Sequence, residues 1–165
     1  MQRLIASHGI SAERVAAGRF IVPSLAHRLV GRPPQDAMTV AYARLCLPYV
    51  GAVCLRHGTV GLGDFTPEAL GDPGTLAIAR HLSVIADNNP NPNALHPVQV
   101  ELDLADGSTV ACDVAEILGS PARPLSPEAA RAKFDACGAP AALWDAATSP
   151  DELPDTRSLL HRCGC

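Results

Sequence analysis

The sequence predicts an α+β fold in which a small antiparallel sheet with a hairpin packs against a buried, kinked helix, followed by C-terminal helices. Three observations support this prediction. Residues 36–58 form a long apolar stretch, residues 98–114 alternate apolar and polar side chains, and prolines and glycines divide the remaining chain into short segments. The length of 165 residues suits one ordinary domain and is too short for two large ones.

Residues 36–58 are predicted to form the central helix. No charged residue occurs from Leu45 to Leu55, and a helix that is apolar on every side must lie in a core or an interface. Pro48 lacks a main-chain donor, so we expect a kink near Cys46 and a second helical piece that starts there. Gly58 should end the helix, because glycine readily adopts the left-handed conformation of a C-cap.

Three short segments are predicted on the N-terminal side of the central helix. They are a helix that ends before Gly9, a strand over residues 14–22 that Pro23 closes, and a loop over residues 24–35. The loop is expected because this stretch contains a glycine and two adjacent prolines, which interrupt regular structure.

The chain is predicted to divide into three parts. The first helix has no N-cap and no room for one, so we expect residues 1–13 to be the end of a truncated helical domain. Residues 14–122 should form the α+β domain. Residues 123–165 should form the C-terminal helices and a frayed tail, because chain ends that are not anchored are usually poorly ordered.

Two helices and a strand are predicted between the central helix and the hairpin. Thr66 and Asp72 each place a capping side chain directly before a proline, which predicts helices over residues 67–70 and 73–81. Residues 83–87 are a short strand candidate.

The hairpin is the clearest β signal, with strands predicted over residues 98–104 and 108–114. A two-residue turn would place each apolar residue opposite a polar position. A three-residue loop instead places Leu102 opposite Val110, and it needs a left-handed residue at its end, which Gly107 supplies.

Composition excludes several classes of function. The net charge of −4 and pI near 5.8, with scattered Lys and Arg, indicate no nucleic-acid or anionic-membrane partner. No apolar run approaches the roughly 20 residues that span a bilayer, and the N-terminus does not resemble a secretory signal, so we expect a cytoplasmic protein. The six cysteines should then be reduced thiols, most of them packed in the core.

No metal or cofactor is expected. His161, Cys163 and Cys165 lie close together, but a structural zinc normally needs a fourth ligand, so a disordered tail is the favoured interpretation. The glycines of residues 58–63 lack the Lys-Ser/Thr ending of a phosphate-binding loop. Cys46 could be proposed as a nucleophile, but apolar surroundings raise a thiol pKa, and core packing is the favoured role.

Several motifs carry a resemblance to a known family. They are RLCLPYVGAV at 44–53, HGTVGLGDF at 57–65, LGDP at 70–73, LADG at 104–107, and PLSPE at 124–128 with Lys133 and Phe134. These resemble the A-[KR]-F-S-L-P-Y-x-V-A pattern, the D-G-x-V-x-x-x-x-F pattern, the hairpin and the P-L-S-x-E helix of the MmgE/PrpD family, in the same order. The resemblance covers most of residues 4–160.

The resemblance implies a location for the substrate site. In the family members 2-methylcitrate dehydratase and cis-aconitate decarboxylase, a histidine that helps line the carboxylate-binding site stands at the position of Leu45. Leucine can neither transfer a proton nor bind a carboxylate, so neither activity transfers directly to this chain. Possible pocket-lining residues are Arg44, Leu45, Cys46 and Tyr49, and no catalytic residue is assigned.

The resemblance also implies a two-part protein, in which a long N-terminal helical domain supplies most catalytic groups. We therefore expect the C-terminal domain of a dehydratase, decarboxylase or iminodisuccinate epimerase-like enzyme for a small polycarboxylate, inactive without that helical domain. The alternatives are a non-catalytic fragment, a small subunit that pairs with a separately encoded helical domain, or an independent binding module. A homo-oligomer or a partner-dependent protein is expected, because Leu47, Val50 and Val53 give the central helix apolar side chains on several sides.

Overall fold

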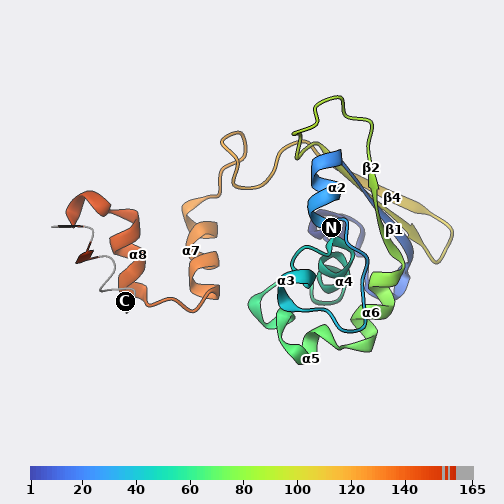
Figure 1. Ribbon diagram of the computed structural model, residues 1–165, viewed down its shortest axis with the longest axis horizontal. Helices are drawn as coiled ribbons and strands as arrows, with labels where there is room; N and C mark the ends of the chain where they lie inside the picture. The colour runs from blue at the N-terminus through green and yellow to red at the C-terminus, as the bar shows by residue number, and fades with distance from the viewer. Residues whose placement is uncertain (154, 156, 159–165) are drawn as a thin grey trace. The chain divides into compact units, whose positions relative to one another are not determined.

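The computed structural model describes residues 1–153, 155, 157 and 158, and the chain forms two compact units, Met1–Ile117 and Leu118–Cys165. The first unit combines a sheet with helices, and the second is helical (Figure 1). The prediction of an α+β fold is confirmed. No helix in the described part of the chain is both long enough and apolar enough to cross a bilayer.

A four-stranded sheet in the order β2-β1-β3-β4 forms one layer of the first unit (Figure 1). Its strands are β1 (Val15–Val22), β2 (Leu82–Ala86), β3 (Val98–Leu104) and β4 (Thr109–Val114). Strand β3 is antiparallel to β1 and β4, whereas β1 and β2 are parallel. The sheet is therefore mixed, which corrects the expectation of an antiparallel sheet. Parallel neighbours need a long crossover, and the helices between β1 and β2 supply it.

The β3–β4 hairpin has the predicted register. Leu102 lies opposite Val110, and the Leu104 amide donates to the Ser108 oxygen at 2.8 Å. Gly107 has a φ of 85°, the left-handed conformation that ends the three-residue loop. On the inward face of β3, Val100, Leu102 and Leu104 are buried and Val98 is partly buried, so the alternating pattern did place one face of the strand in the core.

The predicted central helix is two helices, α3 (Val40–Ala43) and α4 (Leu47–His57). The break near Cys46 was predicted, but residues 36–39 lie outside both helices, and residues 44–46 form a turn between them instead of a kink. Cys46 is the N-cap of α4, and Pro48 lies in its first turn, where a missing amide leaves no hydrogen bond unmade. Gly58 ends α4 with a φ of 75°, as predicted.

Helix α4 is buried because it packs on two sides. One side packs against the sheet in a core cluster with α1 (Gln2–His8) and α6 (Pro73–Arg80), whose buried members include Leu4, Phe20, Val22, Ala52, Leu55, Ala79, Val100 and Leu102. The other side packs in a second cluster with α3, α5 (Pro67–Leu70) and α6, whose members are Met38, Ala43, Cys46, Tyr49, Val53, Leu70 and Leu76. An all-round apolar helix suits this position.

The predicted short helices α5 and α6 are present, and the side chains of Thr66 and Asp72 cap them by accepting main-chain hydrogen bonds. Residues 24–30 were predicted to be loop, but they form helix α2 (Ser24–Val30). Pro23 precedes its first residue and Gly31 follows its last, so the proline and the glycine that would interrupt a helix lie outside it. Helix α1 is present, and Leu4 lies in the core of the first unit. Its origin in a truncated helical domain stays a prediction.

The second unit contains helices α7 (Pro127–Ala136) and α8 (Ala141–Thr148). The Ser126 hydroxyl caps α7 by accepting a hydrogen bond from the Ala129 amide at 3.1 Å. The rings of Phe134 and Trp144 meet edge to face with centroids 5.2 Å apart, so they join the two helices. The predicted tail with His161, Cys163 and Cys165 lies outside the described residues.

Candidate functional site

The segment expected to line the substrate site, residues 44–49, joins α3 to α4. Its first two side chains reach the surface of the first unit. Arg44 is exposed, with its guanidinium 5.5 Å from the centre of the Phe65 ring, and Leu45 is 37% exposed. A guanidinium in this position remains accessible to a ligand while it stacks on an aromatic ring.

Cys46 is buried behind this surface. Its thiol donates a hydrogen bond to the main-chain oxygen of Arg32 at 3.1 Å, and none of the residue is exposed. Burial raises the pKa of the Cys46 thiol, which therefore stays protonated and unreactive near neutral pH. The residue contributes to packing and fixes the start of α4.

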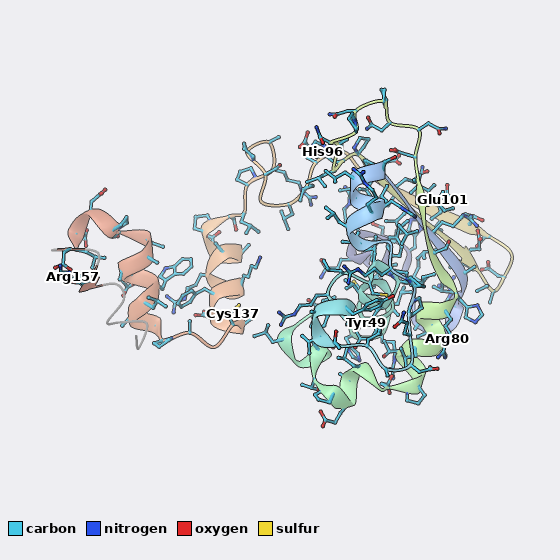
Figure 2. The ribbon with its side chains drawn as sticks, in the orientation of Figure 1. Tyr49, Arg80, His96, Glu101, Cys137 and Arg157 are labelled. Carbon is cyan, nitrogen blue, oxygen red and sulfur yellow. The ribbon has the colours of Figure 1, made fainter. Side chains whose placement is uncertain are left out.

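Tyr49 is also buried, among the helices of the first unit (Figure 2). Its hydroxyl lies 2.6 Å from the main-chain oxygen of Asp64 and 3.2 Å from that of Ala69. Burial, with a smaller effect from the Asp64 carboxylate, raises the pKa of Tyr49. The hydroxyl thus keeps its proton and donates hydrogen bonds to main-chain oxygens, so Tyr49 supports the fold rather than proton transfer.

Tyr49 lines a polar pocket of about 320 Å³ that sequence reasoning missed. Its other lining residues are Val53, Arg56, His57, Asp64, Glu68, Ala69, Asp72 and Thr75. His57 Nδ1 lies 2.9 Å from Asp64 Oδ1, and Asp64 Oδ2 accepts the Gly61 amide at 2.7 Å. Asp64 therefore fixes the turn after α4 through both carboxylate oxygens as well as through its main-chain oxygen.

The other half of this polar pocket is a second hydrogen-bonded group. Asp72 accepts the amide of Thr75 at 2.7 Å and its hydroxyl at 2.8 Å, and it pairs with Arg56, which also donates to the Thr75 hydroxyl at 2.6 Å. The bonds from Thr75, together with the Arg56 charge, lower the pKa of Asp72. Arg56, Asp72 and Thr75 use their hydrogen-bonding groups mainly on one another. Because Arg56 belongs to α4 and Thr75 to α6, these bonds hold the two helices together.

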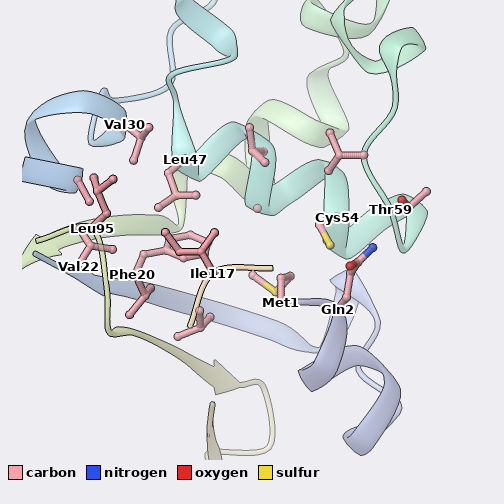
Figure 3. Close-up of a pocket in the computed structure, with 16 residues that line it drawn as sticks. Met1, Gln2, Phe20, Val22, Val30, Leu47, Cys54, Thr59, Leu95 and Ile117 are labelled. Carbon is pink, nitrogen blue, oxygen red and sulfur yellow. The ribbon is translucent and has the colours of Figure 1, made fainter. Parts of the chain in front are cut away.

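A larger cavity of about 720 Å³ lies between α4 and the inner face of the sheet (Figure 3). It is lined by Met1, Gln2, Phe20, Val22, Ala26, Val30, Leu47, Val50, Gly51, Cys54, Thr59, Val60, Leu95, Val98, Val100 and Ile117. We call it the α4–sheet cavity. Leu47 and Val50, which the sequence predicted to be part of an interface, both line it. None of these described lining side chains is charged, in contrast to the polar pocket, but the positive charge of the Met1 amino group lies near enough to Cys54 to oppose the rise that burial gives its pKa.

The expected pocket-lining residues therefore do not share one pocket as a group. Arg44 and Leu45 are at the surface, Cys46 is packed below them, and Tyr49 reaches into the polar pocket. Within the described residues, no three His, Cys, Asp or Glu side chains are grouped so that they could hold a metal ion. The His161, Cys163 and Cys165 candidates lie outside that part of the chain.

Comparison with models of protein families identifies a relationship for most of this chain. A family model described as the MmgE/PrpD C-terminal domain matches residues 1–147. A search of curated proteins gave no significant match. The matched region contains the whole first unit and, in the second unit, α7 and all of α8 except its last residue.

Proposed function

Because this chain belongs to the MmgE/PrpD family, whose C-terminal domain it matches, we propose that it is part of a cytoplasmic lyase or isomerase for a small polycarboxylate. Residues 44–49 form one wall of the substrate site. A helical domain supplies most of the acid and base groups, and the chain is inactive without it. The reaction is an elimination, a decarboxylation or an epimerisation. Each begins with the loss of a proton or a carboxylate from a carbon next to a carbonyl or carboxylate group.

The exposed guanidinium of Arg44, in the turn that joins α3 to α4, is the observation that carries this proposal. Arginine can bind a carboxylate through two parallel hydrogen bonds. Arg44 lies three residues before the first residue of α4, whose N-terminal end has a partial positive charge. The buried side chains of Cys46 and Tyr49 fix this segment from below, so Arg44 and Leu45 project from a rigid turn.

Inactivity of the isolated chain follows from the groups that surround this surface. Leu45 occupies the position of the histidine expected from the family and cannot move a proton. Tyr49 is bonded to main-chain oxygens, and His57 is bonded to Asp64 in the polar pocket. General acid–base catalysis needs a titratable group within hydrogen-bond reach of the substrate. Leu45 has no such group, and burial raises the pKa of the Cys46 thiol.

Leu45 also favours a second candidate function. A subunit that pairs with a separately encoded helical domain could bind or position substrate without a catalytic histidine at this place. Coding sequence for a helical domain in the adjacent DNA, in the same frame, supports the first proposal, whereas a separate gene for that domain supports the second.

Turnover measurements test the proposal. The purified chain is incubated with 2-methylcitrate and with cis-aconitate, and products are followed by the absorbance of the double bond and by NMR. We expect no turnover above a heat-denatured control. Turnover by the chain alone contradicts the proposal, because the acid and base groups would then lie within residues 1–165.

A further inference from the structure

We propose that Arg32 is a second carboxylate-binding residue beside Arg44, and that the two arginines together select molecules with two or more carboxylates over monocarboxylates. This inference rests on the proposed function, because it adds a residue to the same wall of the substrate site. Arg32 lies outside the motif at residues 44–53, in the segment between α2 and α3.

An isolated antiparallel bridge brings the segment of Arg32 to that of Arg44. Gly31 pairs with Cys46 in this bridge, and the Cys46 thiol donates to the Arg32 main-chain oxygen at 3.1 Å. Because the two segments run in opposite directions, the next residues along them, Arg32 and Leu45, are neighbours. Arg32 therefore lies directly beside the proposed wall, although it is distant from Arg44 in the sequence.

Arg32 and Leu45 are on the outer side of this bridge. Successive side chains of an extended segment point to opposite sides. Cys46 has no exposed surface, whereas Leu45 is 37% exposed and Arg32 is exposed. The bridge thus buries Cys46 and turns its two neighbours toward a ligand in solution.

The guanidinium of Arg32 is held in place by an aromatic ring, as that of Arg44 is. It lies 5.3 Å from the centre of the Tyr42 ring, and Arg44 lies 5.5 Å from the centre of the Phe65 ring. The Tyr42 hydroxyl donates to the Pro33 oxygen at 2.9 Å, which ties this ring to the segment of Arg32. A stacked guanidinium keeps its N–H groups available at its edge, and it loses less conformational freedom when it binds a ligand.

Arg32 and Arg44 are also free of competing acidic partners. The arginines of the first unit whose side chains donate to other groups in it are Arg3, Arg14, Arg19, Arg56 and Arg80. Among the described residues, the side chains of Arg28, Arg32 and Arg44 make no ion pair or hydrogen bond. Asp36, the acidic residue nearest to Arg32 in the sequence, pairs with Arg80.

Two unpaired guanidiniums match two carboxylates. Each guanidinium can bind one carboxylate through two parallel hydrogen bonds. If Arg44 acted alone, a second carboxylate of the same molecule would lose water without gaining a cation, which is unfavourable. Arg32 removes this penalty. A monocarboxylate needs only one guanidinium, so it gains little from the presence of both.

NMR titrations of the 165-residue chain at low salt with tricarballylate, succinate and propionate test the inference. Arg32→Ala should weaken tricarballylate and succinate by about tenfold or more. It should leave propionate nearly unchanged, because Arg44 still serves a single carboxylate. Arg28→Ala is the matched control, since it removes the other exposed arginine that lacks an acidic partner, and it should change none of the three affinities.

Arg32→Lys separates the charge of Arg32 from its effect on the turn. Lysine keeps the positive charge but cannot form the two parallel bonds of a guanidinium, so binding of succinate should recover in part relative to Arg32→Ala. Circular dichroism checks the fold of each variant. An absence of recovery would overturn the inference, because Arg32 would then act on the shape of the turn and not on the ligand.

Two further results would overturn the inference while leaving the proposed role of Arg44 intact. The first is a loss of tricarballylate binding with Arg44→Ala but not with Arg32→Ala. The second is an equal loss with Arg32→Ala and Arg28→Ala, which would reflect the overall charge of the first unit. If no carboxylate binds at residues 44–49 of the unsubstituted chain, both this inference and the proposed role of Arg44 are wrong.

Discussion

The hydroxyl of Tyr49 donates a hydrogen bond to the main-chain oxygen of Asp64 across a distance of 2.6 Å. This bond joins the first turn of α4 to the segment that follows the end of the same helix. Asp64 in turn contacts His57 and the Gly61 amide. A tyrosine inside a motif shared with a family of enzymes therefore has a supporting role in this domain, and it positions the turn that borders both the polar pocket and the α4–sheet cavity.

Replacement of Tyr49 by Phe should destabilise the first unit by about 1–3 kcal/mol, because the buried oxygen of Asp64 loses its donor. Tyr42→Phe is the matched control. Its hydroxyl lies 2.9 Å from the oxygen of Pro33 in a more exposed place, where water can replace it, so we expect a loss below about 1 kcal/mol. Urea unfolding measures both free energies. Equal losses would show that the Tyr49 bond is not a structural tie.

Asp72 should make stability depend on pH in the acidic range. Its pKa is lowered in the folded chain, mainly by hydrogen bonds from Thr75. The resulting stabilisation is complete above the unfolded pKa, about 3.9, and is lost as pH falls through the lowered folded pKa. Asp72→Asn retains an N-cap but does not titrate, so its free energy of unfolding should fall less steeply with acid.

Asp72→Ala separates the cap from the charge. It removes the N-cap of α6 as well as the carboxylate, and we expect an additional loss of about 1 kcal/mol at neutral pH relative to Asp72→Asn. Unfolding measured from neutral pH to below pH 3 compares the two variants with the unsubstituted chain. Identical pH profiles for the unsubstituted chain and the Asp72→Asn variant would exclude this carboxylate as a source of acid sensitivity.

Gly51 marks the closest approach of α4 to the sheet. A β-carbon at this position would lie 2.6 Å from Phe20 Cζ and 3.1 Å from Leu82 Cδ1, so Gly51→Ala should cost about 1–3 kcal/mol. Gly63→Ala is the control, because a β-carbon there meets nothing within 4 Å. We expect little change or a slight gain in stability for Gly63→Ala by thermal unfolding. A stable Gly51→Ala variant would show that α4 is not packed this tightly on Phe20.

Local patterns predicted much of the fold. The β3–β4 register followed from alternation and from one glycine, and the caps at Thr66 and Asp72 placed α5 and α6. These features depend on residues a few positions apart. The pairing of β1 with β2 joins Gly18 to Leu82, and such distant contacts leave no local sign. Helix α2 was missed because the prolines that follow it suggested a loop.

The candidate site was less predictable than the fold. The motif at residues 44–53 indicated where to look, but it could not show that Cys46 and Tyr49 bond to main-chain oxygens of other segments. The bonds of His57 with Asp64 and of Arg56 with Asp72 join residues across the end of α4. Neither pair has a helical spacing of three or four residues, which is the signal that predicts side-chain pairs.

An NMR titration with tricarballylate tests most directly whether Arg44 and its neighbours form a carboxylate-binding surface. We expect saturable shifts of main-chain amide signals within residues 44–49. We also expect binding to be weakened about tenfold or more by Arg44→Ala and to be unchanged by Arg28→Ala, which removes another exposed cation of the first unit. An absence of shifts at 44–49, or equal losses in the two variants, would contradict this expectation.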